Sequence, residues 1–165
     1  MSTPPISMRP VRAEDEPVLQ TVRRAAFAPV FASFRAILGE ELYALAQARE
    51  DEQQAALLTS MIAQGSGWDV DVAEADGVVV GFVSVRLAHA EKMGEIGLNA
   101  VHPDQAGRGI GTVMYEHALA RMKAAGMRVA TVSTGGDPSH APARRAYEKA
   151  GFNAGIPSVW LCRAL

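Results

Sequence analysis

The stretch from residue 68 to residue 101 constrains the fold most, because its apolar side chains follow the spacing of β-strands. Between residues 68 and 72 apolar residues alternate with aspartates, as in a strand that buries one face. Asp76-Gly77 follows, a pair typical of tight hairpin turns because both residues tolerate a positive φ. Residues 78–87 are apolar on both faces, which predicts a central strand, and residues 95–101 indicate the next one. We therefore expect three consecutive antiparallel strands.

Helical and further strand patterns flank this run on both sides. Helices are indicated by apolar residues at spacings of three and four, by the cap residue Asp15, and by Gly126 and Gly151 after the last turns. The other expected elements are a strand at 6–12, helices at 15–26, 34–48 and 52–63, a helix at 109–125, a strand at 129–132, a helix at 140–150 and a last strand at 157–163. This order predicts an α/β fold in one domain, residues 1–165, with helices flanking a mixed, mostly antiparallel central sheet.

The composition narrows the function classes. With 48% apolar and 21% charged residues the chain is expected to fold, and its net charge of −2 argues against a general nucleic-acid binder. No apolar run approaches the ~20 residues that cross a bilayer, and the first ten residues lack the apolar core of a signal peptide. We therefore expect a cytoplasmic protein with neither a membrane nor a nucleic-acid partner. The single cysteine, Cys162, argues against an internal disulfide and a cysteine-rich zinc site, and we expect no metal.

Three alternating glycines lie where a strand ends and a helix begins. Gly107, Gly109 and Gly111 let the backbone approach a ligand closely, and the first N–H groups of the following helix have no partner within it. Together with the helix dipole this predicts an anion site, most naturally for phosphate or pyrophosphate, to which Arg108 adds a charged contact. A Walker loop is excluded because no Lys-Ser or Lys-Thr follows, and the dinucleotide pattern fails at Thr112. A plain glycine-rich turn remains the alternative on the glycines alone.

Two segments resemble a known family. Residues 106–111 (AGRGIG), after a strand that ends in Val-x-Pro, match the first signature of the GNAT superfamily of CoA-dependent N-acyltransferases. Residues 140–152 (HAPARRAYEKAGF) match the second signature, and the order of elements fits from end to end. Ala106 departs from the usual Arg or Gln, and His140 from the usual Asn. The resemblance implies a GNAT-like fold whose sheet splays apart between the fourth and fifth strands.

The resemblance also implies a cosubstrate, acetyl-CoA, and the residues that hold it. The pyrophosphate would lie on the backbone amides of Gly107, Arg108, Gly109, Ile110, Gly111 and Thr112. The pantetheine arm would pair like an added strand with backbone near Leu98, Ala100 and Val101. His140 occupies the position of the family's asparagine and is expected to contact the cosubstrate.

Two residues are candidates for proton transfer. Tyr147 matches the family's acid position and would protonate the departing thiolate; a core tyrosine is the alternative. Glu95 lies eleven residues before Ala106, the spacing at which some members have a catalytic glutamate. Partial burial beside Ile96 would raise its pKa and suit it to act as a base; a surface glutamate is the alternative.

The expected function is acetyl transfer from acetyl-CoA to a primary amine by direct attack in a ternary complex. The acceptor, a small molecule or a peptide amine, cannot be read from the sequence. Because many relatives pair, the resemblance also allows for a homodimer. The competing interpretations are a non-catalytic module of the same fold that binds or senses an acyl-CoA, and an interaction protein that has lost the cosubstrate.

Overall fold

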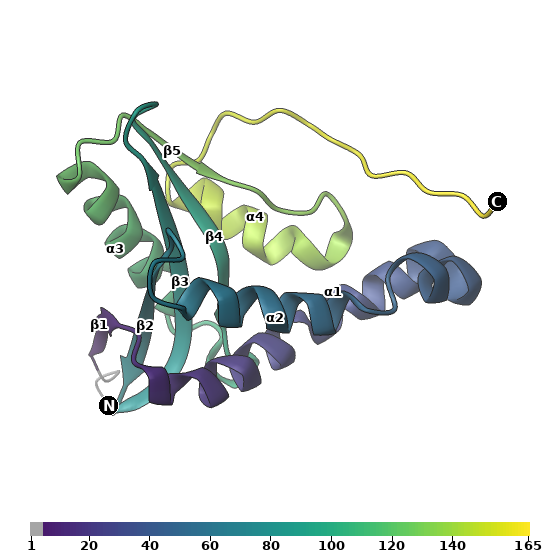
Figure 1. Ribbon diagram of the computed structural model, residues 1–165, viewed down its shortest axis with the longest axis horizontal. Helices are drawn as coiled ribbons and strands as arrows, with labels where there is room; N and C mark the ends of the chain where they lie inside the picture. The colour runs from purple at the N-terminus through teal and green to yellow at the C-terminus, as the bar shows by residue number, and fades with distance from the viewer. Residues whose placement is uncertain (1–4) are drawn as a thin grey trace.

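The structure, a computed structural model, describes residues 5–165 and is built around one five-stranded sheet (Figure 1). The strands follow chain order, β1-β2-β3-β4-β5, and all neighbours are antiparallel except β4 and β5, which are parallel. The strands are β1 (Ile6–Pro10), β2 (Asp69–Ala75), β3 (Val78–Ala88), β4 (Met93–Val101) and β5 (Val129–Val132). The helices are α1 (Glu16–Ala46), α2 (Glu50–Ile62), α3 (Ile110–Ala124) and α4 (Ala141–Lys149), with single 3₁₀ turns at Ala13–Asp15, Pro103–Gln105 and Pro138–His140.

The three-strand run forms as the sequence predicts. Asp76 and Gly77 both have positive φ, 54° and 75°, and they close the hairpin between β2 and β3. β3 is buried without interruption from Val80 to Val85, as expected for a strand that is covered on both faces. The α/β class and the mixed, mostly antiparallel sheet are confirmed.

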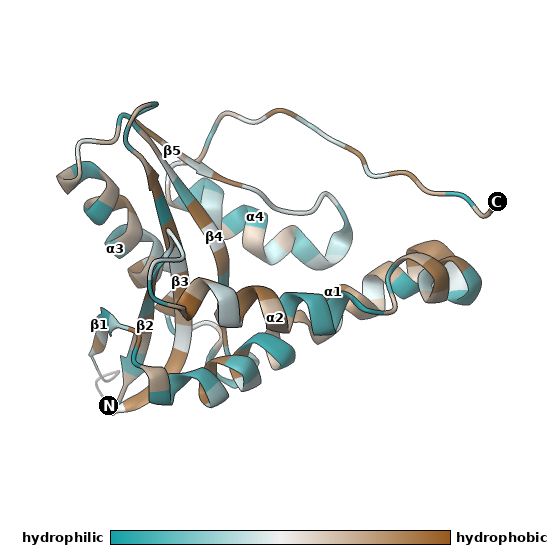
Figure 2. Cartoon of the chain, in the orientation of Figure 1, coloured by the Kyte–Doolittle hydropathy of each residue, from teal (hydrophilic) through white to brown (hydrophobic). Residues whose placement is uncertain are grey.

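Two apolar clusters lie on opposite faces of the sheet. Helices α1 and α2 cover one face, where Leu19 and Leu58 pack against Phe82. Helix α3 covers the other face with Met114 and Met122, and α4 joins it there. Figure 2 shows hydrophobic and hydrophilic residues mixed along these helices, as expected where one side packs and the other is exposed.

The helices before β2 differ from the sequence prediction. Separate helices were expected at 15–26 and 34–48, but α1 runs through both and includes Pro29. The break falls at Gly39 instead, where φ is 77° and ψ is 163°, a backbone conformation that glycine adopts readily and a helix cannot contain. Within residues 5–165 no helix is both long and apolar enough to span a bilayer.

The strand expected at 157–163 is wrong. Residues 153–165, here called the tail, are extended but belong to no strand. The tail leaves the end of α4, passes alongside β5 and then leaves the body of the protein (Figure 1). A strand requires a neighbour to which its backbone groups bond, and the tail exchanges no backbone hydrogen bond with any segment within residues 5–165.

The pairing between β4 and β5 ends halfway along β4. Their pairing covers Met93–Ile96 against Val129–Val132, and beyond it the two strands diverge (Figure 1). At the same point β4 has one residue more than β3, because Val83 faces Asn99 while Val85 faces Ile96. Such a bulge bends the strand that contains it. The splay expected between the fourth and fifth strands is therefore present, and a bulge in β4 coincides with its start.

Candidate active site

The bulge in β4 is held in place by two contacts. Ser84, fully buried on β3, donates a hydrogen bond from its hydroxyl to the carbonyl of Leu98 at 2.8 Å. On Gly97 a Cβ atom would lie 2.4 Å from the ring of Trp68, so only glycine fits beneath that indole. Residues 97–101 of β4, with the predicted pantetheine positions Leu98, Ala100 and Val101, therefore lie beyond the bulge on an edge that β5 does not pair with.

The glycine loop presents six consecutive backbone donors. The N–H groups of residues 107–112 have no hydrogen-bond acceptor within residues 5–165. Gly107 and Gly109 have φ values of 78° and 77°, and Gly109 is the N-cap of α3. A Cβ built on either glycine meets nothing within 4 Å, so side chains of the protein do not fill the loop. This run of donors at a helix N-terminus fits a diphosphate, in both charge and hydrogen-bonding capacity.

Arg108 is anchored beside these donors. Its guanidinium donates a short hydrogen bond to the side-chain oxygen of Gln105. Gln105 is one position earlier than the polar residue usual in the family signature, where this chain has Ala106. The contact positions a positive charge at the loop, which adds to the attraction for an anion.

Tyr147 belongs to a three-residue hydrogen-bonded cluster that the sequence did not predict. Asn99, at the splayed end of β4, donates from Nδ2 to the hydroxyl of Tyr147 at 3.0 Å and accepts from the hydroxyl of Tyr115 at 3.0 Å. The rings of the two tyrosines lie 4.9 Å apart between centroids, and both residues are buried. Burial raises the pKa of Tyr115, and the neighbouring Tyr147 raises it further. Tyr115 therefore keeps its proton and fixes the orientation of the Asn99 amide.

This orientation matters for proton transfer from Tyr147. Nδ2 of Asn99 donates to the phenolic oxygen at 3.0 Å, and the Tyr147 hydroxyl donates to Oδ1 of Asn99 only at 3.4 Å, a long contact from which the proton can turn to a closer acceptor. The same donor would stabilise the phenolate left after that proton departs. The cluster is thus suited to a tyrosine that acts as an acid.

His140 is held against the loop between β5 and α4. Its Nδ1 contacts Oδ1 of Asp137, and Oδ2 of the same carboxylate accepts a hydrogen bond from Ser33 on α1 at 2.8 Å. Burial alone would raise the pKa of Asp137, but the hydrogen bonds from Ser139, Ser33 and His140 outweigh it and lower the pKa. Phe34 stacks on the imidazole with 6.1 Å between ring centroids. The ring is therefore fixed in place at the start of α4.

Glu95 lies in the paired half of β4, opposite Arg86 on β3. The two side chains form a short ion pair, and the Glu95 side chain is 37% exposed. Arg86 in turn stacks over Trp68, with its guanidinium carbon 4.9 Å from the ring centroid. The structure thus places Glu95 on the face of the sheet that α1 and α2 cover, apart from the tyrosine cluster. Within residues 5–165 no group of three metal-ligating side chains comes together.

The sheet diverges beside a run of unpaired amides and a buried tyrosine, an arrangement that fits a phosphate-bearing ligand. A family model described as the acetyltransferase (GNAT) family matches residues 31–152. The chain belongs to this family, as its sequence resemblance implies.

Solved structures have the same fold. The PaiA N-acetyltransferase of Thermoplasma acidophilum, in complex with coenzyme A, matches with a TM-score of 0.72 and 21% identity, over 96% of this chain and 94% of that one. A GNAT family acetyltransferase of Brucella melitensis in complex with acetyl-CoA matches with a TM-score of 0.59 and 26% identity, over 91% and 84%. The ribosomal-protein-S18-alanine N-acetyltransferase of Escherichia coli matches with a TM-score of 0.65 and 16% identity, over 92% and 80%. A comparison with curated proteins finds no match.

Sequence reasoning predicted the loop and Tyr147 as site residues but did not predict the residues that contact Tyr147 and the bulge in β4. Asn99 is the only amide in the apolar stretch of β4, and Ser84 is the only hydroxyl in the buried part of β3. A single polar residue within a buried strand needs a hydrogen-bond partner, and that requirement was the signal available. Tyr115 gave no such signal, because it lies on an amphipathic helix among other candidates for the core.

Proposed function

We propose that this chain transfers the acetyl group of acetyl-CoA to a primary amine by direct attack within a ternary complex. The run of six unpaired N–H groups at residues 107–112 is the observation that carries the proposal. It lies at the start of α3, and Asn99 of the diverging strand β4 binds Tyr147. Membership of an acetyltransferase family and the solved complexes with coenzyme A and acetyl-CoA support this use of the loop.

The chain's own residues would hold the cosubstrate in three places. The amides from Gly107 to Thr112 would bind the diphosphate, with Arg108 adding charge. The open edge of β4 at Leu98, Ala100 and Val101 would exchange backbone hydrogen bonds with the pantetheine amides, as a strand would. His140 would contact the arm from the α4 side.

Acetyl-CoA supplies an activated thioester, and residues of the protein would donate and accept the protons. As the amine nitrogen bonds to the thioester carbon and the carbon–sulfur bond breaks, Tyr147 would give its phenolic proton to the departing thiolate. Asn99 would hold the resulting phenolate through Nδ2. A backbone N–H on the open edge of β4 would donate to the thioester carbonyl as negative charge develops on its oxygen.

Glu95 is the proposed base that removes the amine proton, acting through water. Its carboxylate lies on the face of the sheet that α1 and α2 flank. The acceptor amine would approach from that side. The ion pair with Arg86 uses one carboxylate oxygen, Oε2, so the proton would pass from water to Oε1.

The acceptor would be identified by testing a panel of amines. The Escherichia coli neighbour is named for acetylating an alanine of a ribosomal protein, so peptides with an N-terminal alanine belong in the panel. Polyamines, amino acids and amino sugars represent the small amines.

The test measures free thiol released from acetyl-CoA with and without each amine. We expect release that depends on one class of amine, with the acetylated amine confirmed by mass. Calorimetry with CoA is the matched measurement on the same protein. Binding of CoA without turnover on any amine would favour a sensing module of the same fold, and no binding would favour an interaction protein.

A further inference from the structure

Two opposite charges lie side by side on the part of the sheet that α1 and α2 leave open. β3 is buried from Val80 to Val85, and the next side chain, Arg86, is 54% exposed. Glu95 is its partner across the strands and is 37% exposed. Figure 1 shows β3 and β4 continuing here beyond the two helices. Both charges are therefore accessible to a small molecule on the inner strands of the sheet.

Trp68 holds the arginine of this pair in position. It immediately precedes Asp69, which pairs with Val85, so the continued register places Trp68 opposite Arg86. The guanidinium carbon lies 4.9 Å from the centroid of the indole. The same ring is wedged against Gly97, where a Cβ atom would lie 2.4 Å from it. Stacking uses the flat face of a guanidinium and leaves the N–H groups in its plane free to donate.

Arg86 has N–H groups available for a second carboxylate. Within residues 5–165 its Nη2 donates to Oε2 of Glu95, whereas Nε and Nη1 have no acceptor. A guanidinium of the same chain shows that two carboxylates can share one arginine, because Arg121 contacts both Asp69 and Asp71 at 2.8 Å. The second carboxylate at Arg86 would come from a ligand.

The charge pattern selects a ligand that has both charges close together. Arg86 attracts a negative group, and Oε1 of Glu95, which is not used in the ion pair, attracts a positive one. A free α-amino acid has an ammonium and a carboxylate on a single carbon, so it matches this pattern. A polyamine or an amino sugar has no carboxylate, and the amine at the N-terminus of a peptide has an amide beside it instead.

The pair also lies close to the proposed position of the thioester. The edge of β4 that β5 leaves unpaired begins after Ile96, and Gly97 is two residues beyond Glu95. Two residues of a strand span about 7 Å. An amine held beside Glu95 is therefore near the open edge only if few atoms separate it from the group bound to Arg86.

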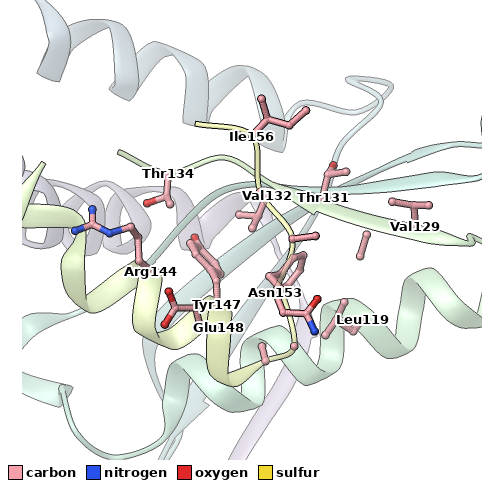
Figure 3. Close-up of a pocket in the computed structure, with 16 residues that line it drawn as sticks. Leu119, Val129, Thr131, Val132, Thr134, Arg144, Tyr147, Glu148, Asn153 and Ile156 are labelled. Atoms are coloured by element: carbon pink, nitrogen blue, oxygen red, sulfur yellow. The ribbon is translucent and has the colours of Figure 1, made fainter. Parts of the chain in front are cut away.

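The largest groove of the described residues is a less suitable place for the acceptor. It has a volume of about 1040 Å³ and lies between β5 and α4, with Tyr147, Arg144 and Glu148 in its wall (Figure 3). Its arginine already donates to the carbonyls of Gly135 and Asp137. Tyr147 packs with α3 and is the proposed donor to the departing thiolate, so this side is assigned to the leaving group.

We propose that Arg86 determines acceptor specificity and that the acceptor is a free α-amino acid. Its carboxylate would bind the N–H groups of Arg86, and its amine would face Glu95. The inference rests on the proposed function, in which a nitrogen–carbon bond forms and the carbon–sulfur bond of acetyl-CoA breaks. The products are then an N-acetylamino acid, free CoA and one proton.

The first test compares each acceptor with its own amide. L-Alanine, L-leucine and L-phenylalanine are assayed beside their carboxamides, which keep the amine and side chain but lose the negative charge. We expect kcat/KM to favour at least one free acid over its amide by ~30-fold or more, and Arg86→Gln to reduce that preference to about threefold or less. Arg49→Gln is the matched control, because Arg49 is also exposed and paired with a glutamate, Glu52, but lies before α2. Equal use of acids and amides by the wild type, or an unchanged preference in Arg86→Gln, would overturn the proposal.

The second test measures binding without turnover. Each amino acid is titrated by calorimetry into the full chain saturated with CoA, which has no acetyl group to transfer. We expect binding that Arg86→Gln abolishes and Arg86→Lys partly restores, with CoA affinity unchanged in both variants as evidence that they fold. A chain that acetylates polyamines or peptides but binds no free amino acid would refute this inference and retain the transferase. Amino-acid binding that depends on Arg86, without turnover on any amine, would support the binding site and refute the transferase.

Discussion

The two halves of the sheet differ in whether their polar groups have partners within the protein. Around β1 and β2 the charged side chains pair with one another: Arg9 binds Asp15 and Glu74, and Asp71 binds His117 and Arg121. Around β4 and β5, as far as residues 5–165 show, the six amides of residues 107–112 have no acceptor and the second edge of β5 has no neighbouring strand. Buried polar groups that are satisfied stabilise a fold, whereas unsatisfied ones are available to a ligand or partner. Substitutions in the first half should therefore change stability, and substitutions in the second half should change binding or turnover.

The largest expected effect is on the amides before α3. Gly109→Glu puts negative charge and a strained positive φ at the proposed diphosphate site, and we expect CoA affinity to fall by at least ~100-fold in calorimetry. Gly126→Glu is the matched control, because Gly126 has a φ of 79° and open space around it but lies after the other end of α3. Equal losses in both variants would show that backbone strain, and not the anion site, is responsible.

Removing the proton of Tyr147 should affect turnover and leave binding intact. Tyr147→Phe keeps the ring packing but deletes the hydroxyl that Asn99 contacts, and we expect kcat to fall about 100-fold with KM little changed. Tyr115→Phe is the comparison, since it removes the other hydroxyl bound to Asn99 and should reduce kcat less. An unchanged kcat in Tyr147→Phe at all pH values would assign the acid to another group.

A substitution at Asp71 tests the prediction for the half of the sheet around β1 and β2. Its side chain is buried, and Asp71→Asn removes the carboxylate partner of His117 and one of the two carboxylate partners of Arg121, so we expect a loss of about 2 kcal/mol in the free energy of unfolding. Denaturant titration measures the loss, and kcat per folded molecule should be unchanged. Asp69→Asn is the control, because Asp69 binds the same Arg121 but is 50% exposed. If Asp71→Asn changed kcat and left stability intact, the division between the halves would fail.

Asp15, in the half around β1 and β2, is expected to make the free energy of unfolding depend on pH. The hydrogen bonds from Arg9 lower its pKa below the ordinary 3.8, so the folded state binds this proton less readily than the unfolded state. The stabilisation is therefore present above about pH 4 and is lost as the pH falls through the folded pKa. We expect Asp15→Asn to be about 1 kcal/mol less stable than the wild type at pH 7, with the difference shrinking below pH 4. A constant difference across pH would contradict the linkage.

An effect of similar size is expected for Glu95, at the boundary between the halves. If Glu95 is the base, Glu95→Gln should flatten the acid limb of the pH–rate profile and lower kcat by about tenfold at neutral pH. Arg86→Gln is the companion, because it frees the carboxylate without removing it and should leave the acid limb in place. An unaltered acid limb in Glu95→Gln would show that Glu95 is not the base and forms only a surface ion pair.

The sequence determined the parts that depend on neighbours along the chain. The hairpin at Asp76-Gly77, the glycines that open α3 and the position of Tyr147 before Gly151-Phe152 follow from local spacing, because turn geometry and helix ends are set by a few adjacent residues. Tertiary structure alone decided the rest. Asn99 meets Tyr147 across 48 positions of sequence, the bulge in β4 depends on Ser84 from the next strand, and α1 continues through Pro29. The expected last strand failed for the same physical reason: a strand exists only where another strand accepts its hydrogen bonds, and the sequence of the tail does not say where that strand lies.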